Sequence, residues 1–215
     1  MVAIEIKEKV DLALQHESAT QQLAERLRRE LPQLRAKLIL PEANPIAGLM
    51  DFITDYVESV PSCLQLVKAL SKQLGFYEYA APFVDMAEDY FLHPPAGLPT
   101  EDSLEALLDE AFLAHRLLEE VNDHHIRHLQ RPLLPLDMTE ANIIVHHLLG
   151  DELANRLDQL VQQAASQLLQ KEYVWAQLKA LPGGESTPLP LFGQGTLARS
   201  PQQVRLRLAR QVPGH

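Results

Sequence analysis

The densest group of residues able to do chemistry lies between positions 115 and 128, in the stretch HRLLEEVNDHHIRH. This stretch holds four of the chain's nine histidines and three of its carboxylates. Histidine and carboxylate side chains bind transition metals and carry protons in catalysis. Metal binding or proton transfer by this protein is therefore expected to involve residues 115–128.

A long predicted helix at residues 104–129 positions these side chains, and it is followed by a proline-containing loop at 131–138. Successive helical residues are rotated by about 100° around the axis, which places four polar residues within about 60° of the apolar direction. The four inward-facing residues are His115, Glu119, Asn122 and His125. Other members of the stretch, including Glu120, His124 and His128, are expected to face water.

A second predicted helix begins at Thr139 and supplies further candidate ligands. His146 and His147 flank its apolar face, and Gly150 at the middle of that face allows a close backbone approach or a local break. Asp151 stands four residues after His147, where it can orient the imidazole ring. If the two helices pack antiparallel, His146 or His147 would face His125 or Asn122.

Buried histidine, glutamate and asparagine side chains are costly unless they satisfy one another, a metal or a ligand. Three interpretations follow: a hydrogen-bond network that fixes helix register, a metal site, or a small-ligand pocket with His115 and Glu119 as acid and base. The metal ligands would be His115, Glu119, His125, His146 and His147, with Asn122 and Asp151 orienting them. Such a site suits non-haem iron or manganese, in an oxidoreductase-like or oxygen-binding bundle. Without a metal, no cofactor is expected.

The spacings His115-x3-Glu119, His124-x3-His128 and His146-x4-Asp151 resemble parts of the haemerythrin-type di-iron pattern. That family carries its first two pairs on separate helices. Here Glu119 and His124 are separated only by EVND and fall on one predicted helix. We therefore assign the chain to no family on this pattern.

The rest of the chain predicts an all-α bundle of about six or seven helices. No clear period-two alternation appears before residue 181. Ser18 and Gln21 form a predicted capping box, and Pro61 is predicted to separate two helices. We expect a helical domain at residues 1–181 and a Pro/Gly-rich tail at 182–215, in which VRLRLAR alternates like a strand.

Charge and composition limit the partners. The net charge is −10, and residues 51–180 carry eight basic and twenty-one acidic groups. This surplus repels a phosphate backbone, so nucleic-acid binding is not expected. The sequence shows no signal peptide or membrane span, which predicts a cytoplasmic protein. The weakly basic tail at 182–215 suggests an alternative function: a non-enzymatic interaction module that docks a protein partner or a second subunit in a homodimer.

Overall fold

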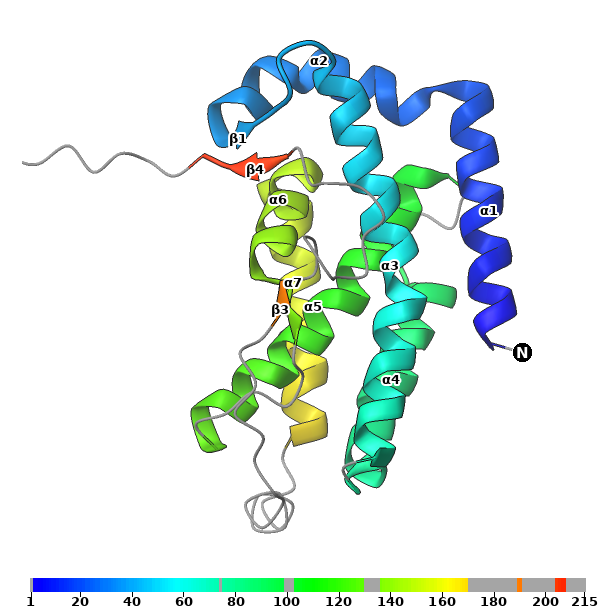
Figure 1. Cartoon of the computed structure of the whole chain (residues 1–215), viewed down its shortest axis with the longest axis vertical. Coiled ribbons are helices and arrows are strands. Elements are labelled where there is room, and N and C mark those ends of the chain that lie inside the picture. Colours follow the sequence, from blue (N-terminus) through cyan, green and yellow to red (C-terminus); the bar gives the residue numbers. More distant parts are fainter. Residues whose placement is uncertain are drawn as a thin grey trace, which may run out of the picture.

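The computed structural model describes residues 2–73, 75–98, 103–129, 136–169, 189–190 and 204–207. These residues form seven helices and four two-residue strands, so the prediction of an all-α bundle is confirmed (Figure 1). The helices are α1 (Val2–Thr20), α2 (Gln22–Lys37), α3 (Pro45–Gln73), α4 (Tyr77–Leu92), α5 (Leu104–Leu129), α6 (Thr139–Leu149) and α7 (Asp151–Leu169). The strands are β1 (Leu38–Ile39), β2 (Leu136–Asp137), β3 (Leu189–Pro190) and β4 (Arg205–Leu206).

Helix α5 is the centre of the bundle, and its bounds agree with the predicted helix at 104–129. It packs against α1, α3, α4, α6 and α7. Between Leu104 and Leu118 every side chain is buried except the half-buried Glu105 and Arg116. A helix that is surrounded on nearly all sides places polar residues in the core together with the apolar ones. His115 is among them.

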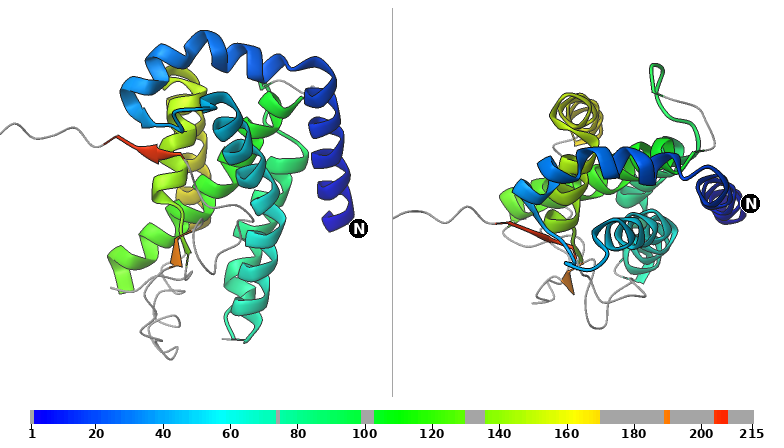
Figure 2. Two further views of the ribbon diagram at one scale, coloured as in Figure 1. Left: turned by 45° about the horizontal axis from the view of Figure 1, so that its top comes forward. Right: turned by 90° about the horizontal axis from the view of Figure 1, so that it is seen from above.

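The chain turns sharply between α1 and α2, and α2 then crosses one end of the bundle above α3 and α6 (Figures 1 and 2). Gln21 at the turn has a φ of 52° in the left-handed region. The carboxylate of Glu17 accepts hydrogen bonds from the backbone N–H groups of Leu23 and Ala24, both at 3.0 Å. The predicted capping box was therefore wrong, because Ser18 lies inside α1 and the buried Glu17 caps α2.

Helix α3 runs from Pro45 to Gln73 without ending at Pro61, so the predicted break there was wrong. Proline removes one helical hydrogen bond and usually kinks or ends a helix. Here Val57 and Val60 before it and Leu64 after it are all buried in the same core. Burial of one continuous apolar face on both sides of the proline outweighs the lost hydrogen bond.

Helices α6 and α7 meet at Gly150, where the sequence allows a local break in the helix. Gly150 has φ 84° and ψ 151°, a conformation that residues with a side chain rarely adopt. Its N–H donates to the carbonyl of His146 at 3.1 Å, and its carbonyl accepts from Ala154 at 3.0 Å. The glycine therefore closes one helix and opens the next, and it brings Asp151 back towards the last turn of α6.

Short strand pairs attach later segments to the body. β4 pairs antiparallel with β1, and β2 pairs parallel with β3. β4 lies within the stretch predicted to alternate like a strand, and Val204 beside it is fully buried. Across the described residues, no helix combines the length and apolar character that a membrane span requires. The division between residues 1–181 and 182–215 stays a prediction.

Candidate metal centre

The structure places the seven sequence-predicted site residues in two regions. His115, Glu119, Asn122 and His125 lie along α5, whereas His146, His147 and Asp151 lie at the corner between α6 and α7. Among the described residues, only the second set places three ligand atoms within 4.8 Å of one another. The predicted ligands therefore divide between the core and the edge of the bundle.

His115 is buried, and both of its ring nitrogens have partners. Nδ1 lies 3.0 Å from the carbonyl oxygen of Ala111, and Nε2 lies 3.1 Å from the hydroxyl oxygen of Ser59. Burial lowers the pKa of His115 to about 4, so the ring is neutral and carries one N–H. Because a carbonyl can only accept, Nδ1 carries this proton, and Nε2 faces the hydroxyl of Ser59, which donates its own proton to the carbonyl oxygen of Tyr56 at 2.7 Å. The ring also packs on Tyr56, with centroids 4.4 Å apart.

Glu119 belongs to a network of charged and polar groups that joins four helices. Its Oε2 accepts hydrogen bonds from Arg116 Nη1 at 2.7 Å and from Asn142 Nδ2 at 2.6 Å. The side-chain oxygen of Asn142, Oδ1, in turn accepts a hydrogen bond from the hydroxyl of Tyr56 at 2.6 Å. Arg116 also binds Asp158 on α7, with Nε 2.8 Å from Oδ1. Glu119 is thus engaged in holding α3, α5, α6 and α7 together.

Asn122 and His125 are also buried, as their position on the inward face predicts. The Nδ1 of His125 lies 2.9 Å from the carbonyl oxygen of Val121, to which it can donate. The ring packs edge-on against Tyr79, with centroids 5.2 Å apart. Neither residue belongs to the group whose ligand atoms converge.

His146 is oriented by its neighbours across the Gly150 corner. Its Nε2 lies 3.3 Å from the side-chain oxygen of Asn155, and its Nδ1 lies 3.9 Å from Asp151 Oδ1. Since the Asn155 oxygen can only accept, Nε2 is the nitrogen that donates, and Nδ1 faces Asp151. A hydrogen bond at one ring nitrogen that leaves the other free to coordinate is typical of metal-binding histidines.

His147 contributes the second imidazole, with its ring nearly perpendicular to that of His146. Its Nδ1 is enclosed by protein and has no hydrogen-bond partner among the residues that the structure describes. Burial lowers the pKa of His147, and the positive charge of Lys37 lowers it further, against the opposing effect of Asp151. His147 is therefore held in the neutral form, which is the form that binds metal.

Asp151 supplies the carboxylate, and Lys37 from the end of α2 is its present partner. The ammonium of Lys37 lies 3.3 Å from Asp151 Oδ1. The two side chains are 43% and 68% exposed, so the ion pair is weak and either group can move at little cost. The sequence predicted Asp151 as a residue that orients His147, whereas the structure places its carboxylate among the converging ligand atoms.

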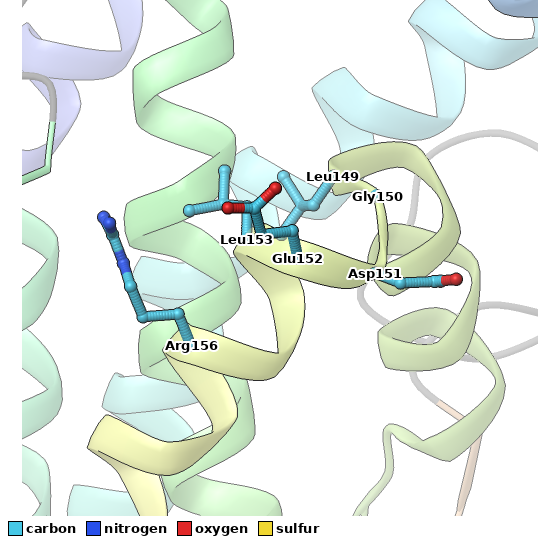
Figure 3. Close-up of a pocket in the computed structure, with 6 residues that line it drawn as sticks. All are labelled: Leu149, Gly150, Asp151, Glu152, Leu153 and Arg156. Carbon is cyan, nitrogen blue, oxygen red and sulfur yellow. The ribbon is translucent and has the colours of Figure 1, made fainter.

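A shallow hollow of about 370 Å³ lies beside this corner, lined by Leu149, Gly150, Asp151, Glu152, Leu153 and Arg156 (Figure 3). In the close-up, the carboxylate of Asp151 points away from the side on which Glu152 and Arg156 lie. Of the three residues with converging ligand atoms, Asp151 lines the hollow and the two histidines do not. The hollow is therefore not the candidate metal centre.

Sequence reasoning missed Lys37 and Asn155, which complete the corner. Asn155 stands nine residues after His146, and a helix through both would have pointed the two side chains apart. Gly150 is the signal that the sequence offers: if it is read as the end of one helix and the start of another, Asn155 can lie beside His146. Nothing in the sequence indicates the approach of Lys37, which lies 114 positions from Asp151.

Comparison with known proteins finds no matching family model, no matching curated protein and no matching solved structure.

Proposed function

We propose that this chain binds one divalent transition-metal ion through His146, His147 and Asp151. The observation that carries the proposal is the convergence of three ligand atoms from these residues within 4.8 Å. Two imidazoles and one carboxylate with open positions are the ligand set of non-haem iron(II) oxygenases. Iron is therefore the expected ion, with manganese as the alternative, and oxygen or redox chemistry is the proposed class of activity.

Small movements would complete the coordination. Metal–ligand bonds of about 2.0–2.2 Å place neighbouring ligand atoms roughly 3–3.5 Å apart, so the present separations of up to 4.8 Å must shorten by at most roughly 2 Å. The carboxylate of Asp151 is largely exposed and can rotate inwards. Two hydrogen-bonding observations support the same proposal. The Nδ1 of His147 has no hydrogen-bond partner among the described residues, and the contact with Asn155 engages only the Nε2 of His146.

The first experiment measures iron, manganese and zinc by elemental mass spectrometry on untagged protein purified without chelators, then again after anaerobic reconstitution. About one ion per chain is expected. His147→Ala and Asp151→Asn should abolish the bound metal. His93→Ala is the matched control, because His93 forms an exposed pair with Asp89 on α4, with 3.1 Å between Nδ1 and Oδ1.

A further variant separates the corner from the wider set of predicted ligands. His115→Ala should lower stability and leave the metal content unchanged, since both ring nitrogens of His115 are already engaged. Loss of metal in His115→Ala at unchanged fold would instead favour a site that extends into α5. Protein that stays metal-free after reconstitution would refute the proposal.

A second candidate function, an interaction module, has one observation in its favour. The edge of β1 accepts an added strand from residues 204–207. A second copy could supply the same segment and produce a homodimer by strand exchange. Light scattering on the intact protein tests this directly, since a monomer at all concentrations excludes the exchange.

A further inference from the structure

The C-terminal strand β4 holds the end of α2 in place. Leu206 pairs with Leu38, and the backbone N–H of Arg207 donates to the carbonyl of Lys37 at 2.9 Å. The Arg207 guanidinium reaches the carbonyls of Arg35 at 3.1 Å and Leu38 at 3.5 Å. The last carbonyls of a helix lack partners within the helix, and Arg207 supplies them here. Docking of this segment therefore fixes the backbone at Lys37.

The same segment is attached to the first turn of α6. Arg205 Nε lies 3.0 Å from Glu140 Oε1, and the Leu206 N–H lies 3.3 Å from the same oxygen. Val204 is fully buried against the core. β4 thus bridges the end of α2 and the helix that carries two of the proposed metal ligands.

Lys37 connects this bridge to the metal centre. Its backbone is bonded to Arg207, and its ammonium lies 3.3 Å from the Asp151 carboxylate. An ammonium at this position neutralises the negative charge that would attract a metal ion, and it repels the ion once bound. A metal ion and Lys37 therefore compete for Asp151.

We propose that the C-terminal strand regulates the metal centre through Lys37. With β4 docked, the fixed backbone of Lys37 keeps its ammonium within reach of Asp151, and metal binding is weak. With β4 released, the whole residue can move away and metal binding is stronger. The inference rests on the proposed function of His146, His147 and Asp151. Because coupling between two binding events is reciprocal, metal binding should also weaken the docking of β4.

The expected effect is about one order of magnitude in affinity. A unit positive charge roughly 6 Å from a divalent ion, at a dielectric close to that of water, weakens binding about tenfold. The water-like value applies because the side chains of Lys37 and Asp151 are 43% and 68% exposed. Salt should reduce the effect.

The test is a double-mutant cycle measured by calorimetric titration of the full-length protein with Zn²⁺, which avoids redox side reactions. Lys37→Met should bind zinc about tenfold more tightly than the wild type. Arg205→Glu, which sets a carboxylate against Glu140, should also tighten binding. In the double variant, Arg205→Glu should increase zinc affinity little beyond the effect of Lys37→Met, because the lysine through which β4 acts is absent. Lys7→Met is the control, since Lys7 forms a comparable exposed pair with Asp11 on α1.

Hydrogen–deuterium exchange gives the second readout. In the wild type, saturating zinc should accelerate exchange of the Arg207 amide, and Arg205→Glu should accelerate it without zinc. Two results would overturn the regulation while leaving the metal site intact. One is that Arg205→Glu increases zinc affinity equally with Lys37 and with Met at position 37. The other is that zinc does not change the exchange rate of the Arg207 amide. Absence of zinc binding in all four proteins of the cycle would overturn the metal site and the regulation together.

Discussion

Replacing Asp109 with asparagine should stabilise the protein above neutral pH and change its stability little at pH 4. Asp109 lies on α5, is only 3% exposed, and its Oδ1 has no hydrogen-bond partner within the described part of the chain. Burial, and after it the charge of Glu105, raise the pKa of Asp109 from 3.8 to about 7. The folded state therefore resists ionisation of this carboxyl group.

Two arginines near Asp109 oppose this effect but do not cancel it. Arg26 is already engaged by Glu105 at 2.9 Å, by Glu30 at 3.1 Å and by the carbonyl of Leu148 at 3.0 Å. Arg156 donates to the carbonyl of Gly97 at 3.0 Å. Their charges lower the pKa of Asp109 less than burial raises it. The carboxyl group is thus left without a dedicated counter-charge.

The sign of the pH dependence follows from the order in which the two states lose the proton. The unfolded chain releases the Asp109 proton near pH 4 and the folded chain near pH 7, so stability is lost across this interval and the loss is complete above it. At about 1.4 kcal/mol per pH unit, the loss comes to about 4 kcal/mol. Asparagine does not ionise and avoids it.

Urea denaturation followed by circular dichroism at pH 4, 5.5 and 8 measures this contribution. The difference between Asp109→Asn and the wild type should rise from below about 1 kcal/mol at pH 4 to about 4 kcal/mol at pH 8. Asp89→Asn, an exposed carboxylate on α4, should show no comparable rise. A difference that is constant with pH, or that falls as pH increases, would refute the burial argument.

Two further substitutions test other parts of the bundle. Tyr56→Phe leaves the buried side-chain oxygen of Asn142 without the donor it has at 2.6 Å and should cost about 1–3 kcal/mol in urea denaturation. Tyr90→Phe is the control: Tyr90 is only half-buried on α4, and its substitution should cost less than about 0.5 kcal/mol. Gly150→Ala should lower the free energy of unfolding by about 1 kcal/mol. The cost comes from the φ of 84° alone, since a Cβ at this position meets nothing within 4 Å. An unchanged free energy of unfolding would show that the backbone at the corner relaxes.

Helical periodicity alone predicted much of α5. The bounds 104–129 and the burial of His115, Asn122 and His125 follow from the spacing of apolar residues, because that spacing determines which side of a helix meets the core. The same reasoning did not find the buried carboxylates Asp109 and Glu110. It assumes one apolar face, whereas five helices surround α5 and bury several of its sides.

Long-range placement could not be predicted from the sequence. Periodicity predicts that a residue is buried but not which helix it contacts. It therefore did not show that His115 contacts Ser59 on α3 rather than a residue at the end of α6. The corner required two further facts: that Gly150 breaks the helix completely, and that α2 brings Lys37 to Asp151. The second depends on the path of the whole chain.

Side-chain atoms that pack helices together are not available to bind a metal ion. The histidine-rich stretch of α5 has the highest density of potential ligands, yet its buried groups already make contacts within the protein, as His115 does with Ala111 on its own helix and with Ser59 on α3. The corner has fewer candidates, but His147 keeps an unpartnered nitrogen and Asp151 keeps the freedom to move. A metal needs uncommitted lone pairs and ligands that can close around it. The edge of the bundle meets both conditions better than its core, which is why the proposed centre lies outside the richest part of the sequence.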